Sequence, residues 1–267
     1  MTELAEMRTA DGTRIVYRLY NRPQSMHRIA LVHSLAMDHT FWLPVAEQLA
    51  ADASVLVYDC RGHGQSDKPS GPYTTALFAA DLANLMDAIN WSSAAVAGAS
   101  MGGCVSLAFA AQFPKRTQAL GLIDTTAWYG PEAPQRWEQR AQKAKTEGMK
   151  GLIEFQTTRW FGDAFRAEHK DVVQRCIDVF LGNDISAYAE TCRMLGSNDL
   201  RSALPTISCP TTVIVGEEDY AATPAMAKAL HAGIGKSRYV LIENARHLTP
   251  LEVPDRIAAE LSLLLKM

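Results

Sequence analysis

The sequence predicts an α/β protein: a mostly parallel central sheet flanked by helices, with an all-helical insertion. Two observations predict this class. Before residue 127 and after residue 204, short apolar and β-branched runs alternate with segments whose apolar residues recur at helical spacing. Between these two parts, the strand-like runs disappear. Since strand–helix alternation produces parallel pairs, residues 1–126 and 205–267 are expected to form one core. Residues 127–204 are expected to form a helical cap, or lid.

Residues 1–126 are expected to form strands and helices joined by short connections. Asp11-Gly12 lies between two β-type stretches and predicts a hairpin turn, with its second strand over 14–20. Helical spacing of apolar residues predicts three helices, over 41–50, 74–89 and 101–112. Buried-strand runs predict four further strands, over 29–33, 54–58, 93–98 and 119–123.

The insertion and the last part complete the pattern. The insertion is rich in Trp, Phe, Arg and Glu, and it predicts helices over 134–147, 148–161, 171–181 and 185–195. After it, strands are expected over 211–216 and 238–242, and helices over 223–232 and from residue 254. Parallel sheets hold their ligands at the carboxyl ends of strands. Functional side chains are therefore expected just after Val32, Tyr58, Gly98 and Ile123.

Composition limits the class of partner. The chain has 267 residues, of which 48% are hydrophobic and 21% are charged, as in an ordinary globular protein. There are 26 Lys plus Arg and 29 Asp plus Glu, so the formal charge is −3. Without a basic excess, neither a nucleic acid nor an anionic membrane is an expected partner. A small-molecule substrate is expected instead, and the oligomeric state is left open, with a homo-oligomer as one option.

Cysteine usage and the chain start favour a cytoplasmic protein. The number of cysteines is odd and no C-x-x-C pair occurs, which argues against a disulfide framework or a zinc cluster. The chain starts with acidic rather than basic residues, and no run approaches the roughly 18 apolar residues of a membrane span. The five cysteines are Cys60, Cys104, Cys176, Cys192 and Cys209.

The segment Gly98-Ala99-Ser100-Met101-Gly102 carries the strongest functional signal. It fits G-x-S-x-G, and it follows a predicted strand and opens a predicted helix, which is the context of a nucleophile elbow. The turn is so tight that the residues two before and two after the serine must be nearly bare, and both are glycine. Ser100 is therefore the candidate nucleophile, with a helix N-terminus behind it.

A serine hydroxyl needs a base, and the base needs an orienting carboxylate. Where this elbow occurs, the acid and the histidine follow the serine along the chain. Asp219 and His247 fit that order, and each comes just after a predicted strand. Asp124 is the second choice for the acid, because it also follows a strand. Glu217 and Glu218 are nearer rivals in sequence, and the remaining histidines are interpreted as packing or surface residues: His27, His33, His39, His63, His169 and His231.

Two backbone amides are candidates for an oxyanion hole. Such a site needs two preorganised donors. One is expected from Met101, the residue after the nucleophile. The other is expected from the loop after the strand at 29–33, where Leu35 is the first candidate and Ser34 the second.

With these motifs, the sequence resembles members of the α/β-hydrolase superfamily over nearly the whole chain. Besides the elbow, residues 58–67 look like its D-x-R-G-x-G-x-S turn. Within the superfamily, the chain is similar to 3-oxoadipate enol-lactonases. The matching pieces are His33-Ser34-Leu35, residues 98–103, Trp137 to Arg140 and Arg159-Trp160-Phe161. Two positions depart from the pattern: Ala36 and Arg246 stand where many members have glycine.

The resemblance implies hydrolysis of an enol-lactone to a dicarboxylic keto acid, with no metal and no organic cofactor. Because that substrate carries a free carboxylate, Arg140 and Arg159 are candidates to bind it. Trp137 and Trp160 are candidate apolar walls. The same triad would also serve a carboxylesterase, another lactonase, a carbon–carbon hydrolase of meta-cleavage products, or a ligand receptor with very slow turnover.

Overall fold

The computed structural model describes residues 3–267 and contains an eight-stranded sheet with the order β1-β2-β4-β3-β5-β6-β7-β8. β2 is antiparallel to both of its neighbours, and all the other pairs are parallel. This arrangement confirms the predicted α/β class. The strands are β1 (Leu4–Arg8), β2 (Arg14–Tyr20), β3 (Arg28–Val32), β4 (Ser54–Tyr58), β5 (Ala94–Ala99), β6 (Thr117–Ile123), β7 (Thr211–Gly216) and β8 (Ser237–Ile242).

The central strands form because their side chains are buried on both faces. Every residue of β4, β5 and β7 is buried, which explains their continuous apolar or small-residue runs. Val32 of β3 pairs with Gly98 of β5, so the loops that follow these two strands begin side by side.

Within residues 3–267, five of the six helices outside the insertion contact strands of the sheet, and the sixth, α10, packs on α1 and α11. α2 contacts α3, and α1 contacts α11. Side-chain caps define two of the N-termini: Thr74 accepts from the Leu77 amide at the start of α2, and Thr223 accepts from the Met226 amide at the start of α9. The six helices are α1 (Leu43–Leu49), α2 (Thr75–Ala88), α3 (Met101–Gln112), α9 (Pro224–Gly233), α10 (Thr249–Glu252) and α11 (Pro254–Leu265).

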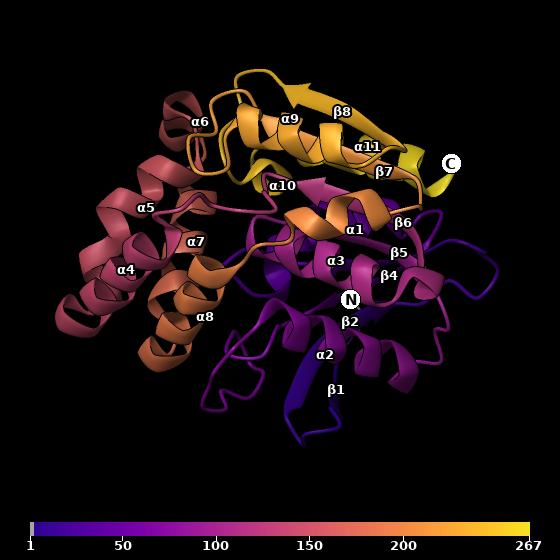
Figure 1. Cartoon of the computed structure of the whole chain (residues 1–267), viewed down its shortest axis with the longest axis horizontal. Coiled ribbons are helices and arrows are strands. Elements are labelled where there is room, and N and C mark those ends of the chain that lie inside the picture. Colours follow the sequence, from indigo (N-terminus) through magenta and orange to yellow (C-terminus); the bar gives the residue numbers. More distant parts are fainter. Residues whose placement is uncertain (1–2) are drawn as a thin grey trace.

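The helices between β6 and β7, called here the inserted helices, gather on the left in Figure 1, beside the sheet and its flanking helices. Within them, α4 and α8 make the most extensive packing contact. The inserted helices are α4 (Ala133–Glu147), α5 (Ile153–Trp160), α6 (Asp163–Glu168), α7 (Lys170–Leu181) and α8 (Ile185–Ser197).

The structure differs from the prediction at two places in this region. The helix predicted over 148–161 is divided: Gly148 adopts φ of 70° and ends α4, a 3-10 turn covers Met149–Leu152, and α5 begins only at Ile153. The six-residue helix α6 was not predicted. It is too short for its apolar residues to repeat at helical spacing.

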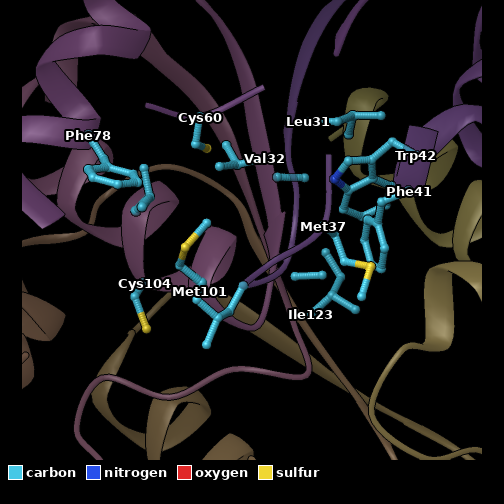
Figure 2. Packing of buried hydrophobic residues seen from close by; sticks show 14 of the residues in the cluster. Leu31, Val32, Met37, Phe41, Trp42, Cys60, Phe78, Met101, Cys104 and Ile123 are labelled. Carbon is cyan, nitrogen blue, oxygen red and sulfur yellow. The ribbon is translucent and has the colours of Figure 1, made fainter. Parts of the chain in front are cut away.

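The core is densely packed where the strands end. Figure 2 shows Leu31 and Val32 of β3 together with Met101 of α3, and Met37 beside Phe41. All five side chains are almost fully buried. The loop after β3 and the start of α3 are therefore held in place by a rigid apolar layer. Among the helices of residues 3–267, none has the length and apolar character needed to cross a lipid bilayer.

Candidate active site

Ser100 stands on a strained bend between β5 and α3. Its φ of 54° and ψ of −115° lie outside the regions that non-glycine residues favour. Neighbouring segments hold the bend: the Ser100 amide donates to the Ile123 carbonyl at 2.9 Å, and Thr125 Oγ1 donates to the Ser100 carbonyl at 2.7 Å. A side chain on Gly98 would overlap the carbonyl of Gly102, which explains why the elbow needs glycine there.

Three side chains predicted as a triad lie in one line of hydrogen bonds. Nε2 of His247 is 2.9 Å from Oγ of Ser100, and Nδ1 of His247 is 2.8 Å from Oδ2 of Asp219. Since the carboxylate can only accept, Nδ1–H donates to Asp219, and Nε2 is left to accept the Ser100 proton. All three residues are buried, with 2% to 7% of their surface exposed. The arrangement can therefore activate the hydroxyl as a nucleophile.

The loop after β7 holds the Asp219 carboxylate in place. Its Oδ1 accepts the amides of Ala221 at 2.7 Å and Ala222 at 2.9 Å. The two rival glutamates point elsewhere: Glu217 accepts from the Asn244 amide, and Glu218 pairs with Arg246. The structure brings Asp219, and neither glutamate, to the histidine.

Asp124, the second choice for the acid, lies close by in a different role. Its carboxylate accepts from the Gly216 amide at 3.0 Å, and from the amide and hydroxyl of Thr249 at 3.1 and 2.7 Å. Burial, together with the nearby Asp219 charge, raises the pKa of Asp124 well above its usual range. Asp124 therefore ties together the loops that carry Asp219 and His247 and makes no hydrogen bond to the histidine itself.

The two predicted oxyanion donors are free. Within residues 3–267, neither the Leu35 amide nor the Met101 amide donates to a protein acceptor. The loop that carries Leu35 is fixed by the buried His33, whose Nδ1 donates to the Ser34 carbonyl at 2.8 Å and whose Nε2 accepts the Cys60 amide at 3.0 Å. Burial lowers the pKa of His33, which favours this neutral form.

At Ala36, where many family members have glycine, the backbone still adopts a conformation that favours glycine. Ala36 has φ of 59°, a left-handed conformation that glycine adopts more readily. Its carbonyl accepts from Nδ2 of Asn183, at the end of the inserted helix α7, at 2.9 Å. The chain thus keeps the glycine-type backbone without glycine.

A cavity opens above Ser100, between the sheet and the inserted helices. It is partly open to solvent, and its empty space, counted with the open side, is about 360 Å³. Eight of the predicted site residues line it, and Asp219 and Met101 lie behind the wall. The lining residues are Ser34, Leu35, Ser100, Tyr129, Trp137, Arg140, Gln156, Arg159, Trp160, Ala221 and His247.

Two cationic side chains in this wall lack an acidic partner. Nε of Arg140 donates to the Tyr188 hydroxyl at 2.6 Å, and the guanidinium lies 4.9 Å from the centre of the Trp137 ring. Burial and the charge of Arg140 lower the pKa of Arg159 to about 10. No ion pair is formed by either arginine within the described part of the chain, and no acidic residue lines the cavity. Two unneutralised charges in a half-closed space create a site for an anion.

Gln156 is a site residue that the sequence analysis missed. It lies on α5, one turn before Arg159 and Trp160, and is only 2% exposed. Its Oε1 is buried without a hydrogen-bond partner, although the side chain faces the cavity. A buried polar atom of this kind is costly unless a ligand or water meets it. The helical spacing of Gln156 with Arg159 was the available signal.

A larger outer cavity, with about 1390 Å³ of empty space, adjoins the inner one. The two share Tyr129, Trp137, Arg140, Arg159 and Ala221. Basic residues also line the outer cavity, namely Arg136 and Lys143, whereas acidic residues are missing from its described lining. A small anion would therefore approach Ser100 through a positively charged entrance.

The remaining histidines pack in the core or lie at the surface. His33, His39 and His63 are buried with partners of their own, and His169 and His231 are exposed. Within residues 3–267, no group of three His, Cys, Asp or Glu side chains is arranged to hold a metal ion.

The chain is similar in sequence and in fold to known proteins. A family model described as the alpha/beta hydrolase fold matches residues 28–175. 3-Oxoadipate enol-lactonase 1 of Acinetobacter baylyi is 30% identical over 236 residues, which cover 88% of this chain and 87% of the relative. The crystal structure of the enol-lactonase from Burkholderia xenovorans LB400 has a TM-score of 0.94 at 34% identity, covering 98% of this chain and 100% of that one. A thermophilic esterase from Thermogutta terrifontis, solved with malate bound, has a TM-score of 0.92 at 28% identity, covering 99% and 98%.

Proposed function

The chain belongs to the α/β-hydrolase fold family, and from this membership we propose that it is a serine hydrolase that opens a small lactone bearing a carboxylate. The matching family model and the enol-lactonase relatives confirm the resemblance that the sequence motifs indicated. The substrate we propose is 3-oxoadipate enol-lactone or a close analogue. The observation that carries this choice is the pair of half-buried arginines that, among the described residues, have no acidic partner in the same cavity as Ser100.

In the first half of the reaction, Ser100 attacks the lactone carbonyl carbon while its hydroxyl proton passes to Nε2 of His247. The oxyanion is stabilised by the free amides of Leu35 and Met101. The ring C–O bond then breaks, and His247 returns the proton to the departing enol oxygen. Because the leaving group belongs to the ring, the acyl-serine keeps the whole substrate attached.

In the second half, a water molecule attacks the acyl carbon and gives its proton to Nε2 of His247. When the acyl–oxygen bond breaks, His247 returns this proton to Ser100, and the product carries a second carboxyl group. Asp219 keeps the His247 ring in the required tautomer and stabilises its charged form in both halves.

The substrate carboxylate is placed against Arg140 and Arg159. A guanidinium binds a carboxylate with two parallel hydrogen bonds, and such charged bonds are stronger in a half-closed cavity. Since the two arginines repel each other, an anion between them relieves a repulsion that already exists in the empty site. Trp137 and Trp160 supply apolar walls for the ring.

A carboxylesterase acting on an acidic ester is the second candidate. It is favoured by the likeness to the Thermogutta terrifontis esterase, and it would use the same triad and the same arginines.

A turnover screen of the purified protein tests the proposal. The substrates are an enol-lactone with a carboxylate, a neutral nitrophenyl ester, an acidic open-chain ester and a vinylogous diketone. We expect kcat/KM to be highest for the acidic lactone, with many turnovers per protein molecule, and S100A to abolish turnover while keeping the wild-type circular dichroism spectrum. A higher kcat/KM for the neutral ester or the diketone would overturn the proposed substrate. A single slow turnover would favour a receptor.

A further inference from the structure

Arg246 lies on the loop after β8, and its side chain reaches the turn between α5 and α6. Residues 158–163 of this turn are called here the α5–α6 corner. Its Nη1 donates to the carbonyls of Thr158 at 2.8 Å and Phe161 at 3.1 Å. These two carbonyls stand on either side of Arg159 and Trp160, whose side chains line the cavity above the nucleophile. One guanidinium group thus holds the backbone that carries two of the cavity residues.

The same guanidinium also contacts the loop of the triad acid. Nη2 of Arg246 donates to Oε2 of Glu218 at 3.0 Å. Arg246 directly precedes His247, and Glu218 directly precedes Asp219. The ion pair therefore joins the two loops at positions next to the hydrogen-bonded pair of acid and histidine. The Arg246 side chain is 15% exposed and that of Glu218 is 43% exposed, so solvent screens this ion pair and its role is to fix geometry more than to add stability.

Main-chain amides also link the α5–α6 corner to the histidine loop, both directly and through Glu252. The amides of His247 and Leu248 both donate to the carbonyl of Trp160, at 3.1 and 3.0 Å. The Glu252 carboxylate accepts the Gly162 amide with one oxygen, at 2.8 Å, and the amide preceding His247 with the other, at 2.7 Å. Movement of the α5–α6 corner would therefore disturb the histidine loop directly.

We infer that Arg246 is a positioning residue that holds the α5–α6 corner in a fixed position relative to the loops of Asp219 and His247. A planar guanidinium suits this role because its several N–H groups point in fixed directions and can serve separate acceptors at once. The inference rests on the proposed function, since it takes Arg159 and Trp160 as the residues that contact the substrate.

The test compares R246Q with R166Q. Arg166 is the matched control because its Nη2 donates to Asp163, an acceptor that it shares with Arg246, but it does not contact Glu218 or the corner carbonyls. kcat and KM are measured on the acidic lactone and on a neutral nitrophenyl ester. Displacement of the corner affects substrate placement, and a shift of about 1 Å costs on the order of 100-fold in rate.

For R246Q we expect KM for the acidic lactone to rise ~10-fold and kcat to fall on both substrates, with R166Q remaining like wild type. R246K should recover part of kcat, because an ammonium can pair with Glu218 but cannot serve all the acceptors. Values for R246Q within about twofold of wild type, or equal losses in R166Q, would overturn the inference.

Two further measurements keep the test decisive. If R246Q does not fold, E218Q removes the same ion pair from the other loop and is expected to lower kcat on both substrates; an unchanged kcat would overturn the inference. If wild type does not open the acidic lactone, the proposed substrate fails. In that case, kcat of R246Q and of wild type on the neutral ester still shows whether Arg246 positions the histidine loop.

Discussion

Nε2 of His247 lies 2.9 Å from Oγ of Ser100, although the two residues are 147 positions apart in the sequence. They follow β8 and β5, which are separated in the sheet by β6 and β7. The histidine loop must therefore extend back across two strand ends to reach the serine. Asp124, which follows β6, supports this path by accepting hydrogen bonds from Gly216 at the end of β7 and from Thr249 at the start of α10.

The roles of the two aspartates can be separated by D219N and D124N. In D219N, the amide cannot hold the required tautomer of His247, so kcat is expected to fall by about 10³-fold or more. D124N loses an acceptor for loop amides, and the expected result is a lower melting temperature with most of kcat retained. Steady-state kinetics and thermal unfolding check both outcomes. If D124N lost kcat as severely as D219N, the assignment of the acid would be wrong.

Removal of the Arg140 charge should discriminate between substrates. A charge-assisted hydrogen bond contributes about 1.5–3 kcal/mol, so R140Q should lower kcat/KM for the acidic lactone by roughly 10- to 100-fold, with little change for the neutral ester. R136Q is the matched control, because Arg136 lies one turn earlier on α4 and lines only the outer cavity. Equal effects of R140Q on both substrates would exclude a carboxylate contact.

Gly102 allows α3 to approach the sheet closely. A Cβ at this position would overlap the Val32 carbonyl, and the carbonyl of His33 lies 2.7 Å away. G102A should therefore push α3 off β3, reduce the free energy of unfolding by about 1–3 kcal/mol, and lower kcat by displacing Ser100. Urea unfolding and kinetics measure the two effects. G235A is the control, since a Cβ there has no atom within 4 Å, and a similar loss in G235A would contradict this explanation.

Stability should depend on pH through His63. Burial and the neighbouring His33 lower the pKa of His63 to about 3, whereas the unfolded chain binds a proton near pH 6.5. The unfolded state therefore gains a proton as the pH falls from 7.5 to 5.5 and the folded state does not, so this residue removes about 1.4 kcal/mol of stability over that range. H63Q should lose correspondingly less than wild type in urea unfolding at the two pH values. H231Q, at an exposed site, should behave like wild type, and identical pH dependence in H63Q would refute the assignment.

Most of the fold was predictable because its signals are local. The buried run of β4 and the capped apolar periodicity of α2 each determine an element within a few residues. The end of one helix at residue 147 was predicted, but the 3-10 turn over Met149–Leu152 was not, because such a turn leaves the apolar pattern of a longer helix almost unchanged. The helix α6 was not predictable in this way, because its six residues are too few to show a periodic apolar pattern and it packs on α7.

The candidate site was predictable where chemistry restricts the residue type. A serine between glycines, and an aspartate and a histidine after later strands, are recognisable without coordinates. Gln156 escaped notice because a neutral amide on a helix is usually exposed, and only the tertiary structure buries it. Arg246 was seen only as a departure from a family pattern. Its role depends on carbonyl groups 85 and 88 positions away, which no local pattern encodes.

The carbonyl of Trp160 has a consequence for attempts to change substrate preference by exchanging segments between relatives. Because this one main-chain oxygen accepts two amides of the histidine loop, a transplanted insertion must reproduce an acceptor at the same point, whatever its side chains are. A chimera joined outside this corner, with residues 158–163 kept from the host, should retain a working triad. One joined inside it should lose activity toward every ester, and not only toward the original substrate.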